Sequence, residues 1–399
     1  MIKEPYNFTE NDLFKYGGVE KKTSDSKDKL GIPKNIDVDS KIKDYTVIDL
    51  IGEGSYSSVW NVYNKDKNNI YAIKMTKPNN DDEKVAQNEI SILKKLNNNE
   101  YIIKLHNSFY YKNNNDKYLC MCFDKLGCDL HVLKRLFKYK NDYYNDSDNS
   151  SDVSFHDPII AIPFKLSKKI VYQILKGLDY MHDNNIIHTD LKLDNILINK
   201  NVLDIKSDED INIKICDFGT SHTTKDKCDF TIGTIDYSAP ECIIGLPYGK
   251  GIDIWATGCI LFELITGICL FDYSRYYEDA SDLSSCFSSS SYDDENDKTQ
   301  IEFLLLCMMK KILGNFPTKI FKKGKYYDNY FDYKGRFRFF PIFLEETSLL
   351  KSLVDEFNYE EEIAIPLNNI LLQFLDINPN TRKNVKSLLN NEWFLDKSH

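Results

Sequence analysis

Apolar and polar residues alternate or form short runs in the first third of the chain, whereas later segments repeat apolar residues at helical spacing. Tyr45–Asn64 joins two apolar runs through a glycine turn, which predicts a β-hairpin. Asn69–Met75 and Tyr118–Leu126 predict further strands. Apolar residues spaced along one face predict helices over Glu83–Leu96 and Lys165–His182. The pattern therefore predicts an α+β protein.

The places where these patterns begin and stop predict the domain boundaries. A small sheet-rich lobe with one main helix is expected over about 45–123, and a larger, mainly helical lobe over about 128–394. Residues 1–44 are polar with weak periodicity, so an N-terminal extension is expected there. Two polar stretches, 138–157 and 272–299, are expected to be insertions on the surface.

One stretch, Ile254–Phe271, is apolar enough to imitate a membrane span. It contains Glu263 and two Thr-Gly pairs, so a buried helix is the better interpretation. The N-terminal residues have no apolar core, so we expect no signal peptide and no membrane association. The chain shows no coiled-coil pattern, and a monomer is expected.

Charge and cysteine content narrow the possible partners and compartments. The 399 residues include 51 Lys and Arg against 61 Asp and Glu, a net charge of −10. This balance argues against direct nucleic-acid binding and is compatible with a basic partner, although ordinary solubility is the simpler explanation. Ten cysteines without a C-x-x-C pair indicate a reducing compartment, so we expect the cytoplasm, the nucleus or both.

A glycine turn joins the two strands of the predicted hairpin. The turn and its flanks consist of Ile51, Gly52, Glu53, Gly54, Ser55, Tyr56, Ser57, Ser58 and Val59. Glycine lets a backbone close over phosphates without a Cβ in the way. Taken alone, the turn is more often a plain hairpin turn than a phosphate-binding loop. It lacks the Gly-Lys-Ser/Thr of a P-loop and does not open a helix as a Rossmann turn does.

A lysine and a glutamate follow the hairpin. Lys74 lies on the predicted strand between apolar neighbours, where an ammonium group needs a partner. Glu89, in the next predicted helix, can provide that partner. A lone lysine on a strand is more often simply solvated, so the pair indicates a functional site only together with the other motifs of the chain.

A cluster of polar residues follows the short apolar run at Ile186. Asp190, Lys192 and Asn195 come first, and Asp217 follows a second apolar run. An asparagine and an aspartate at the ends of neighbouring strands provide oxygen ligands for Mg²⁺. Asp190 is expected to act as a base towards a nucleophile, and Lys192 to neutralise phosphate charge.

This ordered set of groups resembles the protein kinases, which share a glycine loop, a strand lysine, a helix glutamate, a catalytic aspartate and two metal ligands. Ser238–Cys242 adds the Ala-Pro-Glu that closes an activation segment, and the resemblance implies that Arg382 pairs with Glu241. It covers about Tyr45 to Phe394.

The resemblance implies a bilobal α+β kinase fold, with ATP and Mg²⁺ as cofactors. It places Lys74 and the glycine turn on the nucleotide phosphates, and Asn195 and Asp217 on the metal. It also implies that Phe123 guards the adenine pocket and that Asp124 to Leu126 form the hinge that contacts the nucleotide.

Finer motifs resemble the SR-protein kinases, serine kinases that act on Arg-Ser-repeat splicing factors. The shared features are a His-Thr-Asp triplet at Thr189, a glycine turn that ends Ser-Ser-Val-Trp, and a Gly-Gly segment before the domain. Thr189 replaces an arginine that usually grips a phosphorylated activation loop. We therefore expect activity without loop phosphorylation. Ser238 departs from the arginine of this kinase group, so the geometry of the substrate loop is open.

The resemblance implies basic, Arg-Ser-rich protein substrates and non-specific serine/threonine kinase activity. The acidic stretch Asp355–Ile363 could bind arginines, although charge runs are more often solvated surfaces. A dual-specificity kinase of the LAMMER type is an alternative, as is a pseudokinase scaffold. Cys216, next to Asp217, could be a reactive thiol or a buried structural one.

Overall fold

The computed structural model describes a set of ranges within the 399 residues. They are residues 8–10, 12–13, 36–54, 57–97, 99–113, 116–145, 162–224, 233–273, 294–338 and 347–395. Ser55 and Tyr56 of the glycine turn lie outside these ranges, as do most of the two predicted insertions.

The chain forms two compact units, each built from separate segments. The first unit comprises Met1–Tyr139, Tyr180–His188 and Leu193–His222. The second comprises Lys140–Asp179, Thr189–Lys192 and Thr223–His399. The first unit thus combines the predicted sheet-rich region with the segments that carry Asn195 and Asp217.

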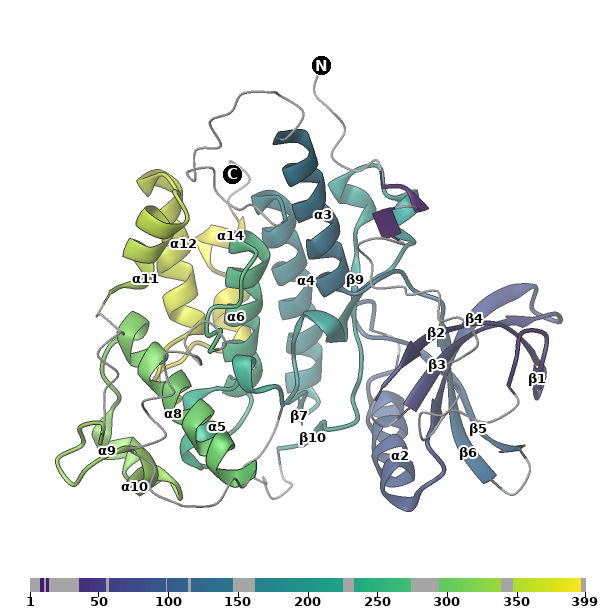
Figure 1. The fold of residues 1–399 in the computed structure, drawn as a ribbon, viewed down its shortest axis with the longest axis horizontal. Helices are drawn as coiled ribbons and strands as arrows, with labels where there is room; N and C mark the ends of the chain where they lie inside the picture. The colour runs from purple at the N-terminus through teal and green to yellow at the C-terminus, as the bar shows by residue number, and fades with distance from the viewer. Residues whose placement is uncertain are drawn as a thin grey trace. The chain divides into compact units, whose positions relative to one another are not determined.

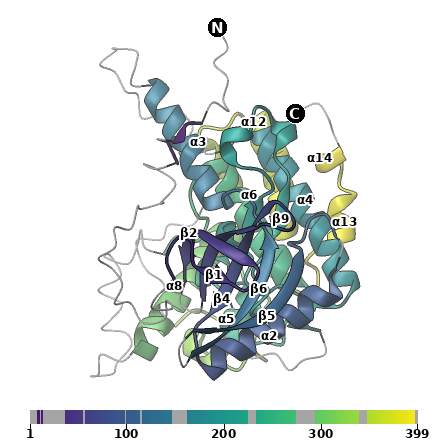
Figure 2. The same ribbon diagram turned by 90° about the vertical axis from the view of Figure 1, so that its right-hand side faces the viewer.

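A six-stranded sheet dominates the described part of the first unit, with strand order β1-β2-β3-β4-β6-β5. All of its neighbouring strands pair antiparallel. The strands are β1 (Lys41–Ile42), β2 (Tyr45–Glu53), β3 (Ser57–Asn64), β4 (Asn69–Thr76), β5 (Leu105–Asn113) and β6 (Asp116–Asp124). Helix α2 (Asn80–Lys95) packs against β4, β5 and β6 (Figure 2). The predicted hairpin, strands and helix are confirmed.

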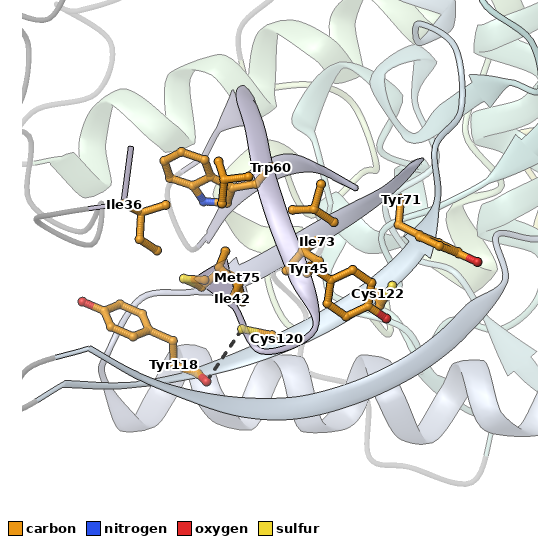
Figure 3. Close-up of a cluster of buried hydrophobic side chains, with 12 residues drawn as sticks. Ile36, Ile42, Tyr45, Trp60, Tyr71, Ile73, Met75, Tyr118, Cys120 and Cys122 are labelled. Atoms are coloured by element: carbon orange, nitrogen blue, oxygen red, sulfur yellow. Dashed lines mark hydrogen bonds between the residues drawn. The ribbon is translucent and has the colours of Figure 1, made fainter. Parts of the chain in front are cut away.

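One face of this sheet carries an aromatic and aliphatic core. Tyr71, Ile73 and Met75 alternate along β4 towards this face, because successive side chains of a strand point to opposite sides. Ile36 and Ile42 lie against them (Figure 3). The sheet and its core therefore begin before Tyr45, inside the predicted extension, since two isolated isoleucines are too few to produce a strand pattern.

Shorter elements also occur in the described part of the first unit. They are β7 (Ile186–Ile187), η2 (Leu193–Asn195), β8 (Ile196–Ile198), η3 (Val202–Asp204), η4 (Asp208–Asp210), β9 (Ile213–Ile215) and β10 (His222–Thr223), whose last residue belongs to the second unit. Helices α3 (Leu130–Asn145) and α4 (Phe164–Asp183) run from one unit into the other. Because α3 continues to Asn145, the expectation of a loop beginning at residue 138 is wrong for residues 138–145.

Helices make up most of the described part of the second unit (Figure 1). They are η5 (Ile235–Tyr237), α5 (Pro240–Ile244), α6 (Gly251–Thr266), α8 (Asp294–Leu313), α9 (Thr318–Phe321), α10 (Tyr327–Tyr330), α11 (Leu349–Lys351), the π-helical turn η7 (Ser352–Glu356), α12 (Glu361–Phe374), α13 (Val385–Leu389) and α14 (Glu392–Leu395). Helix α8 already begins at Asp294, so the predicted surface insertion 272–299 is helical in its last residues.

Helix α6 is the buried centre of the second unit, as the sequence predicts. Every residue from Ile252 to Thr266 is buried, and α12 packs against it. On α4, the predicted apolar stripe is fully buried. Among the described residues, no helix combines the length and apolar character needed to cross a membrane.

Candidate active site

Lys74 lies between two carboxylates of the first unit. Alternation along β4 turns it away from the aromatic core and towards α2, where its Nζ lies 2.8 Å from Glu89 Oε2 and 2.9 Å from Asp217 Oδ1. Glu89 is only 2% exposed. Burial by itself would lower the pKa of Lys74, but the two carboxylates outweigh it and raise the pKa above its usual value. Lys74 is therefore a fixed cation, and the predicted Lys74–Glu89 pair is confirmed.

A small antiparallel ladder brings Asn195 and Asp217 to the same end. Ile196 of β8 pairs with Ile215 of β9, and the Cys216 N–H donates to the Asn195 carbonyl at 2.9 Å. Asn195 therefore precedes its strand, and the expectation that it ends one is wrong. Antiparallel pairing achieves the same proximity, because the start of one strand meets the end of the other.

The residues around Asp217 hold its backbone in a rare conformation. Its φ of 61° lies in the left-handed region, which aspartate tolerates better than most residues. The ring of His188, fully buried, bonds the Cys216 carbonyl at 3.0 Å and packs edge-on against Phe218. The Asn88 side-chain amide of α2 donates to the carbonyls of Gly219 and Ser221. Helix α2 thus fixes both Lys74 and the chain after Asp217.

Cys216 is a structural residue in this setting. Its Sγ donates to the Asn195 carbonyl at 3.3 Å. Burial, with the Asp217 carboxylate as the next cause, raises the pKa of its thiol well above the usual value. The thiol stays protonated, which favours the structural interpretation over the reactive one.

The glycine turn connects β2 to β3 without needing glycine for its own packing. A Cβ at Gly52 would lie 3.9 Å from Val59, and one at Gly54 would lie 3.7 Å from the Ser57 carbonyl. Both are ordinary contacts, so the absence of side chains leaves room for something outside the protein. Ser58 points into the core, where its hydroxyl accepts a hydrogen bond from Trp60 Nε1.

The predicted hinge is anchored at both ends. Asp124 ends β6, and its Oδ1 lies 2.6 Å from His106 Nε2. The Gly127 N–H donates to the Ile198 carbonyl at 2.8 Å, and a Cβ at Gly127 would lie 1.9 Å from the Lys200 carbonyl. Glycine is therefore required there by a close backbone approach. His106 has no motif around it that marks it as functional.

In the second unit, Asp190 and Lys192 share a partner that the sequence did not reveal. The Thr234 N–H and hydroxyl donate to Asp190 Oδ1 at 2.8 and 2.9 Å. Lys192 Nζ donates to the Thr234 hydroxyl at 2.8 Å and lies 3.3 Å from Asp190 Oδ2. The carboxylate of Asp190 is thus oriented and paired with a cation.

Backbone strain marks the residue before Asp190. Thr189 has φ 76°, a conformation that β-branched residues rarely adopt and that costs about 1–3 kcal/mol. Its N–H donates to the buried carboxylate of Asp253 on α6 at 3.0 Å. Gly233 lies so close that a Cβ would be 2.5 Å from the Thr189 carbonyl. These contacts hold the strained residue in place.

Three carboxylates, those of Asp236, Glu263 and Asp272, lie close together in the second unit. Tyr237 donates to Glu263 Oε2 at 2.5 Å. Burial, then the charges of Asp272 and Glu263, raises the pKa of Asp236 to about 6. Crowded carboxylates of this kind gain stability from a nearby cation.

Helix α5, which ends the activation segment, is tied to the rest of the second unit by a buried ion pair. Arg382 donates to both Glu241 oxygens at 2.6 and 2.8 Å, and the side chains are 0% and 1% exposed. It also donates to the carbonyls of Gly251 and Asp376 and lies over the Trp255 ring. The predicted pair is confirmed.

The donor groups of the first unit fit a magnesium nucleotide. The Asp217 side chain is half exposed, and Asn195 adds an amide oxygen. Mg²⁺ prefers such hard oxygen ligands and completes its shell with phosphates and water. Within the described ranges, no cluster of three or more His, Cys, Asp or Glu could hold a metal ion by itself.

Comparison with known proteins agrees with this arrangement. The protein kinase domain matches residues 45–394. The chain is 25% identical to the serine/threonine-protein kinase SRPK of Physarum polycephalum, over 88% of this chain and 86% of that one. It is 26% identical to the serine/threonine-protein kinase prp4 of Schizosaccharomyces pombe, over 88% and 67%.

The human dual specificity tyrosine-phosphorylation-regulated kinase 3 is 31% identical over 71% of this chain, but only 40% of that protein is covered. Protein kinases in general use ATP with Mg²⁺. The matched region contains every residue of the two groups described above. This chain belongs to the protein kinase family, and its named relatives are serine/threonine or dual-specificity kinases.

Proposed function

We propose that this protein transfers the γ-phosphate of ATP to serine or threonine hydroxyls of Arg-Ser-rich proteins. The observation that carries the catalytic part is the contact of Lys74 Nζ with both Glu89 and Asp217. An ammonium group fixed in this way is suited to orient nucleotide phosphates, because its position and charge are set before binding.

Each predicted residue has a role that its contacts support. When bound, Mg-ATP supplies the phosphoryl group and the cation that offsets its charge. Asn195 and Asp217 hold the metal. Asp190, oriented by Thr234, accepts the proton of the substrate hydroxyl, and Lys192 offsets charge on the phosphoryl oxygens.

Activity without activation-loop phosphorylation is supported by the second unit. Thr189 provides no cation that would need a phosphate partner, and its backbone is held by Asp253 instead. The N–H and hydroxyl of Thr234, a residue of the activation segment, orient Asp190 directly. The test is to express the protein in bacteria, confirm by mass spectrometry that it is unphosphorylated, and assay it. Turnover that begins only after an upstream kinase is added would refute this part.

Basic substrates are supported by exposed and crowded carboxylates. Asp355, Glu356, Glu360, Glu361 and Glu362 are all exposed in the second unit. Burial and the charges of Asp272 and Glu263 raise the pKa of Asp236, so a cation placed beside its carboxylate would be favourable. Arginine side chains of a substrate would pair with the exposed carboxylates and with Asp236, through hydrogen bonds that a guanidinium group forms better than an ammonium group.

A peptide panel tests this specificity. An Arg-Ser-repeat peptide should be phosphorylated much faster than Lys-Ser and acidic, casein-like peptides, and its advantage should decrease with salt. Because this chain is similar to a kinase named as dual specificity, the panel includes a fourth peptide, in which tyrosine replaces the serine of the Arg-Ser peptide. Equal rates on all serine peptides would refute the proposed specificity while leaving kinase activity intact. Rapid tyrosine phosphorylation would favour the dual-specificity alternative.

A further inference from the structure

Residues 318–338 of the second unit concentrate positive charge in an otherwise acidic protein. This segment contains seven cations and two carboxylates, a net of +5, whereas the whole chain carries −10. The seven cations, all exposed, form what we call the basic surface: Lys319, Lys322, Lys323, Lys325, Lys334, Arg336 and Arg338. Charge segregated in this way creates a local field that attracts a partner of the opposite sign.

The basic surface is continuous across separate elements. Helix α10 contacts α8, because the Tyr330 hydroxyl donates to Glu302 and the Tyr330 ring stacks on Phe303. The turn after Phe331 folds back onto α9. A Cβ at Gly335 would lie 2.7 Å from Thr318, and Lys322 Nζ donates to the Tyr333 carbonyl at 3.2 Å. The turn that carries Lys334 and Arg336 therefore lies against the segment that carries Lys319 and Lys322.

An aromatic cluster holds this surface in shape. The rings of Phe331 and Phe337 stack at 4.6 Å, and Tyr327 stacks on Phe331 at 4.7 Å. Phe316 contacts Phe321, Phe331 and Phe337 with ring centroids 5.2 to 5.8 Å apart. Because the base is rigid, little conformational entropy is lost when the surface binds a partner.

The chemistry of the basic surface favours a protein segment over a nucleic acid. Guanidinium groups recognise phosphate better than ammonium groups do, but the guanidinium groups of this surface already bond other groups of the chain. Arg336 bonds the Asp332 carboxylate, and Arg338 bonds the Asp328 carbonyl. The carboxylates of Asp328 and Asp332 would repel a uniform phosphate backbone. A protein segment can place carboxylates on the lysines and other groups on these aspartates.

Tyr333 provides an apolar contact in the middle of the charged residues. It is 81% exposed at the tip of the turn, and Lys334 Nζ lies 5.4 Å from its ring centre. Exposed tyrosines surrounded by polar groups are common anchors of protein interfaces.

We propose that the basic surface, with Tyr333 as its aromatic anchor, is a docking site for an acidic segment of a partner protein. The proposal does not depend on the proposed substrate specificity.

Fluorescence anisotropy of the full chain with a labelled glutamate-rich peptide tests the proposal. Reversing three cations, in Lys322→Glu/Lys323→Glu/Lys334→Glu, should raise the Kd at low salt by at least about tenfold. The matched control reverses three exposed lysines of the first unit: Lys65→Glu/Lys94→Glu/Lys95→Glu. This control has the same net charge and should bind nearly as wild type. Tyr333→Ala should raise the Kd by about three- to tenfold with the charge unchanged.

Three results would overturn the proposal. One is the absence of measurable peptide binding by the wild type at low salt. Another is an equal loss of binding in the control, which would mean that only net charge matters. The third is tighter binding of a uridine-rich single-stranded RNA than of the peptide, which would point to a nucleic-acid surface. Phosphotransfer to a basic peptide, unchanged in both triple variants, would show that these proteins are folded and active.

Discussion

Replacing Arg382 with methionine would remove a hydrogen-bond donor from three acceptor groups, of which one is a buried carboxylate. These are the Glu241 carboxylate and the carbonyls of Gly251 and Asp376. The side chains of the pair are 0% and 1% exposed, so water cannot replace the lost bonds. Breaking one side of a buried ion pair costs about 3–5 kcal/mol, chiefly because the remaining charge is buried alone. We expect Arg382→Met to lower the free energy of unfolding of the second unit by that amount.

Urea unfolding followed by tryptophan fluorescence measures this loss. The chain has three tryptophans, and Trp60 belongs to the first unit. In a Trp60→Phe background, the signal comes from Trp255 and Trp393 of the second unit, and Trp255 contacts the Arg382 guanidinium. The transition of the second unit can therefore be followed separately.

Two further variants make the prediction specific to burial. Arg336→Met removes an arginine from an exposed pair with Asp332 in the same unit and should cost at most about 1 kcal/mol. Adding Glu241→Gln to Arg382→Met removes the unpaired charge and should recover part of the loss. A loss below about 1 kcal/mol in Arg382→Met, equal to that of Arg336→Met, would refute the reasoning.

Three other substitutions test the account. Lys74→Met should lower phosphotransfer by at least about 100-fold with circular dichroism unchanged, because Asp217 loses its cation; activity within a factor of two of wild type would contradict this. Thr234→Val keeps the shape but removes the hydroxyl that orients Asp190, so kcat should fall about 10- to 100-fold while the KM for ATP stays constant. A rise in KM alone would argue for a nucleotide-binding role. The pKa of Asp236 is about 6 in the folded state, above its ordinary value. Between about pH 4 and pH 6 the native state therefore retains a proton that the unfolded state loses, so stability falls as the pH rises through this range. The difference corresponds to about 3 kcal/mol at most, and partial solvent access reduces it to about 1–2 kcal/mol. Asp236→Asn should therefore raise the free energy of unfolding by that amount at pH 7 and have no effect below about pH 4. An equal gain at both pH values, measured by urea unfolding, would exclude the titration of Asp236 as the cause.

The elements that could be predicted from the sequence are those with long, regular apolar patterns. The hairpin at Tyr45–Asn64 and helices α4 and α6 bury nearly complete stripes or faces. Strand β5 was not predicted, because it is the last strand of the sheet and is only half buried along its length. Helix α3 extends into a polar stretch because its buried first turns nucleate a helix that continues at low cost.

The site residues also differ in whether the sequence around them predicts their role. Asp190, Asn195 and Asp217 belong to motifs in which neighbouring residues carry the signal. Thr234 and His106 act through partners far along the chain, and nothing beside them in the sequence marks that contact. Tertiary structure alone brings such pairs together, so single-sequence reasoning cannot find them without a family pattern.

The rate of phosphotransfer from Mg-ATP to an Arg-Ser-repeat peptide, by unphosphorylated wild type and by Asp190→Asn, tests the central claim most directly. Asn is close in shape and keeps an acceptor for Thr234, but it cannot take the hydroxyl proton. The account predicts phosphoserine formation by the wild type and a rate at least about 100-fold lower in Asp190→Asn. Equal rates in the two proteins, or no phosphoserine from the wild type, would contradict the assignment of Asp190 as the catalytic base of a serine/threonine kinase.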